Sequence, residues 1–175
     1  MMVFSIIIYI KVFLISPLMI IFECLIRYFF IFISLSYPYI VAIGASSGGL
    51  EEINSFFDYT IELNVSYVII HHFSKENTST LVELLARHSR ILVKYATDQM
   101  QVEANVVYIL PNNSLVTIEN YRFHIKPPLT AEFSKFSIDH FFSSLAYCCK
   151  RKTIGIILSG TGTDGVAGLK MIKNE

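Results

Sequence analysis

The sequence predicts an α/β domain with a doubly wound, mostly parallel sheet and one β-hairpin, preceded by an apolar segment. Two observations predict the sheet. Short apolar runs rich in β-branched residues alternate with helical patterns, and glycine-containing polar loops join two of these runs to the helices that follow. Parallel strands read as continuous apolar runs because helices cover both of their faces. We therefore expect one Rossmann-like domain over residues 37–175, a length that suits a single α/β domain.

The first half of this domain contains two strand–helix units. The run Tyr-Ile-Val-Ala-Ile-Gly is short, apolar and rich in β-branched residues, which is typical of a buried parallel strand. A second run has the same character, and the segment after it spaces leucines at helical intervals, at positions 81, 84 and 85. The expected elements are a strand at Tyr39–Gly44, a helix at Leu50–Phe57 opened by Ser-Ser-Gly-Gly, a strand at Val65–Ile70 and a helix at Thr78–His88.

The second half adds two strands, two helices and a hairpin. A third apolar run ends at Pro-Asn-Asn, which is a turn signal. Two short runs then flank the polar triplet Glu-Asn-Tyr, a pattern that indicates a β-hairpin. The expected elements are a strand at Val106–Leu110, hairpin strands at Leu115–Ile118 and Arg122–Ile125, a helix at Ile138–Cys149 with Phe141, Phe142 and Leu145 on its apolar face, a last buried strand at Thr153–Leu158 and a closing helix from Val166.

Residues 1–36 differ in composition from the rest of the chain. Their only charged residues are Lys11, Glu23 and Arg27. The stretch from Val3 to Phe22 is about long enough to cross a bilayer core of roughly 30 Å, although Pro17 interrupts it. Two interpretations stay open: a transmembrane anchor, or an extension that belongs to no folded domain. A signal peptide is not expected, because no basic region precedes the apolar part and no small-residue cleavage site follows it.

Composition excludes several classes of protein. With 53% hydrophobic and 16% charged residues, the chain is too apolar to be disordered. Its 14 Lys and Arg balance 14 Asp and Glu, and the absence of a basic block argues against a nucleic-acid partner. Cys24, Cys148 and Cys149 have neither the spacing of a disulfide framework nor that of a metal site. We expect no metal and no cofactor.

Three loops at predicted strand ends carry reactive groups. The first, Gly44–Gly49, fits the Gly-x-Ser-x-Gly pattern of a nucleophile elbow, which would expose the hydroxyl of Ser46 above the sheet. The helix N-terminus that follows would stabilise an oxyanion. A phosphate-cradling loop and a plain tight turn are the alternatives.

The other two loops carry a histidine pair and an acid. His71 and His72 end the strand one βαβ unit after Ser46, and spacing alone does not decide which of them faces the site. Asp164 is the only acid of the loop 159–165. It either caps the helix that follows or orients an imidazole. The chain order Ser…His…Asp differs from those of the α/β-hydrolases, chymotrypsin and subtilisin.

Five sequence blocks follow one another along the predicted domain. They are Val41–Glu51 (VAIGASSGGLE), Ile69–Phe73 (IIHHF), Val107–Pro111 (VYILP), Ile138–Ala146 (IDHFFSSLA) and Gly155–Gly165 (GIILSGTGTDG). In this order they resemble the catalytic domain of the CheB family, the chemotaxis protein-glutamate methylesterases. Gly-Leu-Glu in the first block and Asp-His-Phe-Phe in the fourth look most like the branch fused to a CheR-type methyltransferase.

The resemblance implies a serine hydrolase that removes γ-glutamyl methyl esters from the cytoplasmic helices of chemoreceptors and, in some members, deamidates glutamines. Matching by motif places the nucleophile at Ser46, the base at His72 and the acid at Asp164. Ser47 is the implied oxyanion donor through its N–H, and Thr161 lines the site. The implied partners are a methylated receptor and a CheR-type methyltransferase, and the implied location is the cytoplasm, with membrane contact if residues 1–36 span a bilayer.

Departures from the family pattern define the alternatives. The family's receiver domain is not recognisable, and the chain stops at Glu175, inside a helix after which the family continues. The domain over 37–175 is therefore expected to be incomplete at its C-terminus, and a truncated, inactive module that only binds receptors or is membrane-tethered is the rival interpretation.

A short-chain dehydrogenase is disfavoured as a second enzyme class. Leu50 stands where that family's nucleotide-binding turn has a third glycine, and Tyr147-Cys-Cys-Lys150 is one residue short of its Tyr-x-x-x-Lys catalytic pair.

Overall fold

The computed structural model describes residues 37–45, 49–58, 60, 64–72, 78–128, 133–159 and 163–175. The segment 1–36, for which we predict either a membrane anchor or a non-domain extension, lies outside the described residues. Within the described ranges, none of the helices has the length and apolar character needed to cross a bilayer.

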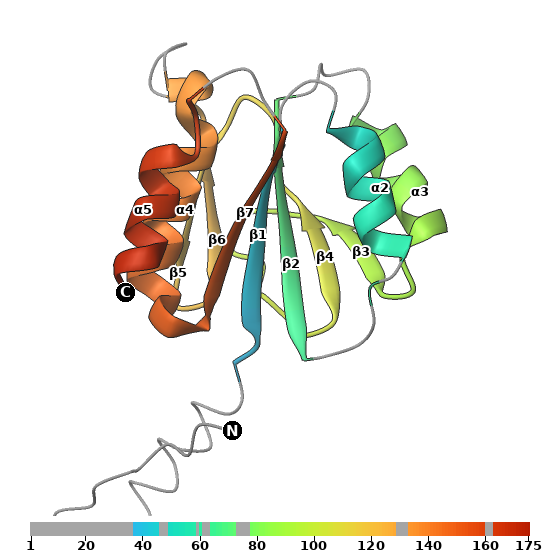
Figure 1. Cartoon of the computed structure of the whole chain (residues 1–175), viewed down its shortest axis with the longest axis horizontal. Helices are drawn as coiled ribbons and strands as arrows, with labels where there is room; N and C mark the ends of the chain where they lie inside the picture. Colours follow the sequence, from blue (N-terminus) through green and yellow to red (C-terminus); the bar gives the residue numbers. More distant parts are fainter. Residues whose placement is uncertain are drawn as a thin grey trace, which may run out of the picture. The chain divides into compact units, whose positions relative to one another are not determined.

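Five parallel strands form the central sheet (Figure 1). Their spatial order is β3-β4-β2-β1-β7, so β1 lies between β2 and β7. This arrangement confirms the predicted, mostly parallel sheet. The prediction that the last strand is buried is wrong, because β7 lies at the edge of the described sheet and its Ile154 is 49% exposed. The bounds are β1 Tyr39–Ala45, β2 Val65–His71, β3 Leu92–Tyr95, β4 Val106–Ile109 and β7 Thr153–Ser159.

Helices cover the sheet on both faces, with α2 and α3 on one side and α4 and α5 on the other (Figure 1). This confirms the doubly wound class. Each helix follows a predicted apolar pattern, and the bounds differ from the expected ones by one residue at most. They are α2 Leu50–Asp58, α3 Thr78–His88, α4 Ser137–Cys149 and α5 Val166–Asn174, with short 3₁₀ turns η2 Phe133–Phe136 and η3 Lys150–Lys152.

The alternation of side chains along β1 divides the interior into two cores. Ile40 and Ala42 pack into the core on the α4 side of the sheet, whereas Val41 and Ile43 pack into the core that contains α2 and α3 residues. Successive residues of a strand point to opposite faces, so an all-apolar strand serves both cores. This explains why the six residues of β1 after Tyr39 are all buried.

The sequence analysis did not predict β3. This four-residue strand forms the edge of the sheet beside β4, and its first residue, Leu92, is 57% exposed. The strand has only four residues, one of them the polar Lys94, and none is buried. It therefore lacks the continuous apolar run by which a buried strand is recognised in a sequence. Pairing with β4 on one side holds it in the sheet.

The predicted hairpin is present and covers α4. Its strands are β5 Leu115–Glu119 and β6 Arg122–Lys126, joined by the two residues Asn120 and Tyr121 with φ values of 49° and 58°. Positive φ at both positions is the signature of the type I′ turn, whose twist matches that of the strands. The Ile118 N–H donates to the hydroxyl oxygen of Ser144 on α4 at 3.1 Å, which ties the hairpin to the helix.

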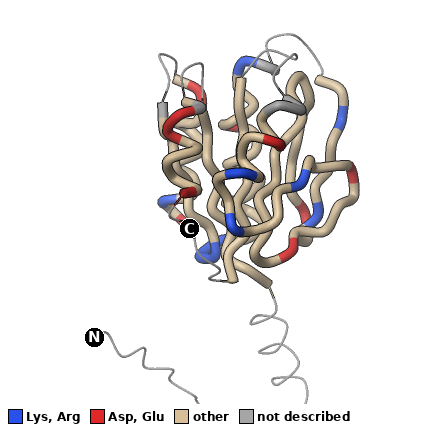
Figure 2. The backbone as a smooth tube through the Cα atoms, turned by 90° about the vertical axis from the view of Figure 1, so that its right-hand side faces the viewer, with Lys and Arg blue, Asp and Glu red and all other residues tan. Residues whose placement is uncertain are grey.

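Charged residues of both signs are interspersed over the described domain (Figure 2). Lys94 Nζ lies 2.6 Å from Glu103 Oε2, and His88 Nδ1 lies 2.7 Å from Asp58 Oδ1, linking α3 to α2. Exposed pairs of this kind contribute about 0–1 kcal/mol each. The stability of the domain therefore comes mainly from its two apolar cores.

The contact between α4 and α5 generates a test of the packing. A Cβ at Gly168 would lie 2.5 Å from Phe142 Cβ and 2.9 Å from the carbonyl oxygen of Asp139. Helix propensity alone favours Gly168→Ala by about 1 kcal/mol, whereas overpacking costs about 1–3 kcal/mol. We expect a net loss of stability in urea unfolding. The exposed neighbour supplies a control, because Ala167→Gly measures propensity in the same helix. A gain from Gly168→Ala equal to the loss from Ala167→Gly would contradict the close contact.

Candidate functional site

The carboxyl ends of three parallel strands meet at one edge of the sheet. In the pairing register, Ala45 of β1 lies opposite His71 of β2 and Ser159 of β7. The N–H of His72 donates to the carbonyl oxygen of Ala45 at 3.3 Å. The three loops that the sequence analysis singled out therefore start side by side, at the edge where α/β sheets bind ligands.

The structure joins His72 to Asp164, which are 92 positions apart in the chain. Nε2 of the imidazole lies 2.8 Å from Oδ2 of the carboxylate, within the range of a strong hydrogen bond. The His72 side chain is 28% exposed and that of Asp164 is 11% exposed. The imidazole is therefore reachable from solvent, while the acid behind it is mostly covered.

The carboxylate of Asp164 is held by the N-terminus of α4. Its Oδ2 accepts the N–H of Ile138 at 3.0 Å, and its Oδ1 accepts the N–H of Asp139 at 2.9 Å. The first N–H groups of a helix have no partner within the helix, and an anion placed there is stabilised by the helix dipole. The interpretation of Asp164 as a cap for the helix that follows is thus wrong for α5, whose N-cap is Gly165 without a side-chain bond. Asp164 caps α4 instead.

Close packing keeps the Asp164 loop against α4. Gly165 has a φ of 93°, a left-handed conformation that L side chains rarely adopt, and a Cβ there would lie 2.8 Å from Ile138 Cγ2. A Cβ at Gly44 of β1 would also lie 2.8 Å from that atom. Asp139 in turn accepts the N–H of Gly168 at 2.7 Å through Oδ1. The start of α4 is therefore fixed to both β1 and α5.

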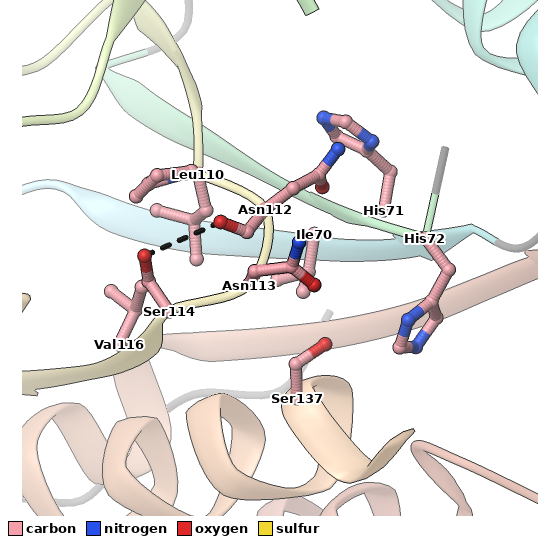
Figure 3. Close-up of a pocket in the computed structure, with 10 residues that line it drawn as sticks. Ile70, His71, His72, Leu110, Asn112, Asn113, Ser114, Val116 and Ser137 are labelled. Carbon is pink, nitrogen blue, oxygen red and sulfur yellow. Dashed lines mark hydrogen bonds between the residues drawn. The ribbon is translucent and has the colours of Figure 1, made fainter. Parts of the chain in front are cut away.

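The two histidines of the pair occupy different environments. Figure 3 shows their rings pointing in different directions, with His71 beside Asn112. His71 is only 4% exposed, and burial, together with the neighbouring His72, lowers its pKa from 6.5 to about 4. His71 is therefore neutral at pH 7. Of the two, His72 is the one bonded to Asp164, and its role as the base stays a prediction.

A cavity of about 80 Å³ lies beside His72. Its wall is formed mainly by the loop after β4, and Figure 3 shows the side chains of Asn113 and Ser137 on the same side as the His72 ring. The Ser114 hydroxyl donates to the carbonyl oxygen of Asn112 at 3.3 Å, which closes the turn of this loop. The cavity thus offers polar groups at a short distance from the histidine–acid pair.

The sequence analysis missed these cavity residues. It interpreted the segment 111–113 only as the end of a strand and gave no role to Ser137. The sequence could have indicated the segment 111–113, because a loop at the carboxyl end of a parallel strand lies at the same edge of the sheet as the loops after β1 and β2. No local signal marks Ser137, which reaches the cavity because Asp164 draws the start of α4 to this edge.

Three predicted site residues, Ser46, Ser47 and Thr161, lie outside the described residues, so their roles stay predictions. Among the residues that the structure describes, no group of three or more metal-ligating side chains is brought together. Cys148 and Cys149 are free thiols.

The sequence and the structure of this chain each match the same kind of domain in known proteins. The family model described as CheB methylesterase matches residues 41–175. The crystal structure of the Thermotoga maritima CheB methylesterase catalytic domain aligns with a TM-score of 0.70 at 27% identity, covering 78% of this chain and 75% of that one.

Curated relatives extend the comparison. A protein-glutamate methylesterase/protein-glutamine glutaminase of Yersinia pestis is 32% identical over 139 residues, covering 77% of this chain and 40% of that protein. A relative from Leptospira interrogans is 29% identical over 137 residues, covering 77% of this chain and 71% of that protein. This chain thus spans less than half the length of the Yersinia relative.

The bonds of Asp164 predict a structural effect of Asp164→Asn. An amide presents one acceptor oxygen, so it can no longer accept both α4 N–H groups on separate oxygens, and we expect a loss of about 1–2 kcal/mol in urea unfolding at pH 7. Asp139→Asn is the matched control, because its remaining carbonyl oxygen can still accept the Gly168 N–H, and it should cost less. Equal losses from the two variants would contradict the capping role of Asp164.

Burial of neutral His71 predicts that stability falls between pH 6.5 and pH 4. In this window the unfolded chain binds a proton on this imidazole that the folded chain does not, because the folded pKa is about 4 against 6.5. One pKa unit corresponds to about 1.4 kcal/mol, so the loss amounts to roughly 3 kcal/mol. We expect His71→Gln to remove this part of the pH dependence in urea titrations at pH 7, 6 and 5. Parallel curves for the parent and the variant would contradict it.

Proposed function

This chain belongs to the CheB methylesterase family, and from that premise we propose that it hydrolyses γ-glutamyl methyl esters of chemoreceptors with a Ser-His-Asp site. As a member of the family it is a carboxylic ester hydrolase. The observation that carries the proposal is the hydrogen bond of 2.8 Å between His72 Nε2 and Asp164 Oδ2 at the carboxyl ends of β2 and β7. Ser46 follows directly after Ala45, the end of β1, which lies between those two strands.

His72 acts as the general base through Nδ1. Its Nε2 is engaged by a carboxylate that already accepts two backbone N–H groups, and an ionised carboxylate can only accept. Nε2 therefore carries the proton, and Nδ1 keeps the lone pair that removes the proton of a serine hydroxyl. Asp164 fixes this tautomer and stabilises the imidazolium that forms.

The reaction proceeds in two steps. Ser46 Oγ attacks the ester carbonyl, its proton passes to His72, and methanol leaves with that proton while an acyl-enzyme forms. Water, deprotonated by His72, then releases the glutamate and restores Ser46. The N–H of Ser47 donates to the oxyanion of each tetrahedral intermediate, and Thr161 lines the same pocket.

The cavity beside His72 receives the reacting end of the glutamyl side chain. Its volume of about 80 Å³ is small, which suits a methyl ester or a primary amide better than a bulky group. The amide follows the same course with ammonia as the leaving group, which accounts for deamidation. Asn113 and Ser137 provide polar groups toward which the carbonyl end can be oriented.

The proposed substrate is a methylated helix on the cytoplasmic side of a receptor, and the proposed place of action is the cytoplasm. A CheR-type methyltransferase is the partner reaction, because it supplies the esters that this domain removes. Membrane contact through residues 1–36 remains a prediction for a segment outside the described residues.

Methanol release from a methylated receptor tests the proposal with the full chain. We expect Ser46→Ala and His72→Gln each to reduce the rate by about 10³-fold or more, because each removes a group that acts as part of one unit. Ser47→Ala is the matched control in the same loop. It keeps the backbone N–H and should retain activity within about tenfold.

Folding is checked by circular dichroism, and receptor binding is measured in parallel. A folded chain that binds receptor without releasing methanol would favour the rival interpretation, a truncated module that binds only. Release that survives Ser46→Ala would rule out the serine mechanism.

A further inference from the structure

The first turn of α5 takes its cap from α4. The N-cap residue of α5 is Gly165, which has no side chain to accept a hydrogen bond. The N–H of Leu169 bonds to the carbonyl oxygen of Gly165 at 2.9 Å, so Gly168 is the last residue of the first turn whose N–H needs an acceptor outside the helix. Asp139 of α4 supplies that acceptor, because its Oδ1 accepts the Gly168 N–H at 2.7 Å.

The two helices therefore exchange caps. Asp164 immediately precedes the N-cap of α5, yet its carboxylate accepts N–H groups of α4, while Asp139 in the first turn of α4 accepts an N–H group of α5. The two acids are also joined directly, since the backbone N–H of Asp139 donates to Oδ1 of Asp164 at 2.9 Å. Asp139 thus connects the carboxylate of Asp164 to the helix that begins two residues after it.

Close packing makes this connection sensitive to the Asp139 side chain. Gly168 is buried, and a Cβ there would lie 2.9 Å from the carbonyl oxygen of Asp139. A buried N–H that loses its acceptor keeps no compensating hydrogen bond to water, which is unfavourable. Without the Asp139 carboxylate, the start of α5 therefore moves or admits a water molecule. Asp164 moves with it, because only Gly165 separates Asp164 from the helix.

We propose that Asp139 is a positioning residue of the esterase site, an inference that rests on the proposed function. Its carboxylate holds the start of α5 on α4 and thereby keeps Asp164 at hydrogen-bonding distance from His72. Asp139 acts through Asp164 and not on the substrate. Since Asp164 stabilises an imidazolium that forms only during the reaction, loss of this support lowers kcat and leaves KM unchanged.

Methanol release by the full chain separates this role from a general loss of stability. Displacement of a catalytic group by about 1 Å can cost about 100-fold in rate, so we expect Asp139→Ala to lower kcat by about 10- to 100-fold. KM should stay within about twofold of the parent value. Asp139→Asn should keep kcat within about threefold, because its amide oxygen can still accept the Gly168 N–H.

Ser144→Ala is the matched control on the same helix. It removes the acceptor of the Ile118 N–H, a hydrogen bond of 3.1 Å that ties the hairpin to α4 and has no link to Asp164. This variant should lose stability in urea unfolding and leave kcat at the parent value.

The hydrogen bond between His72 and Asp164 can be observed without turnover. In the full chain with isotope-labelled histidine, the proton on His72 Nε2 resonates far downfield in NMR spectra because it is bonded to a carboxylate, and its absence from His72→Gln assigns it. We expect this resonance to move upfield, or to disappear through exchange with water, in Asp139→Ala. It should keep its position in Asp139→Asn and in Ser144→Ala.

The two readouts distinguish this proposal from the proposed function. An unchanged His72 resonance in Asp139→Ala would overturn the positioning role whether or not the chain releases methanol. Equal losses of kcat from Asp139→Ala and Asp139→Asn would overturn it as well, because the acceptor oxygen would then not matter. A parent chain that shows the resonance but releases no methanol would contradict the proposed function, and the resonance in Asp139→Ala would still decide whether Asp139 positions Asp164.

A second variant serves if Asp139→Ala does not fold. In Asp139→Ser the hydroxyl oxygen ends one bond short of the Oδ1 position, so a water molecule can satisfy the Gly168 N–H while the direct bond is lost. The same upfield movement of the His72 resonance is expected, and an unchanged resonance would again overturn the proposal.

Discussion

The rest of the site depends on the hydrogen bonds that the carboxylate of Asp164 accepts. It bonds to His72 after β2 and to the first N–H groups of α4, so one side chain from the loop after β7 connects three elements. The two backbone N–H groups belong to the first turn of α4, where they have no acceptor within the helix, so the carboxylate supplies the partner that they lack. The same contact caps a helix and orients an imidazole, so stability and geometry at this edge cannot be altered separately.

Strand order explains why this edge is the site. β1 lies between β2 and β7 with a parallel partner on each side, so its carboxyl end is flanked by the loops after β2 and β7. The two glycines that contact Ile138, Gly44 and Gly165, let α4 approach the sheet closely at this end. A bulkier residue at either position would push the start of α4 away and separate Asp164 from its donors.

α4 supports the candidate site from one face of the sheet. Its first turn binds the acid and contributes Ser137 to the small cavity beside His72. The hairpin packs along the helix and is tied to it by the hydrogen bond from the Ile118 N–H to the Ser144 hydroxyl.

The sequence by itself determined the α/β class, four of the five strands of the sheet, the hairpin and the four helices, because local periodicity and apolar runs encode them directly. It did not determine the burial of β7, because burial depends on the strand's place at the edge of the described sheet. The sequence also singled out the three loops, and the resemblance selected His72 within its pair. Ser46, Ser47, Thr161 and the segment 1–36 remain predictions outside the described residues. The short edge strand β3 escaped because it buries too little to show a pattern. Only the tertiary structure decided that Asp164 caps α4 rather than α5, that its carboxylate reaches His72, and that the loop 111–114 and Ser137 line the cavity. These contacts join residues tens of positions apart, and such pairings follow from how the strands assemble, which no local pattern records.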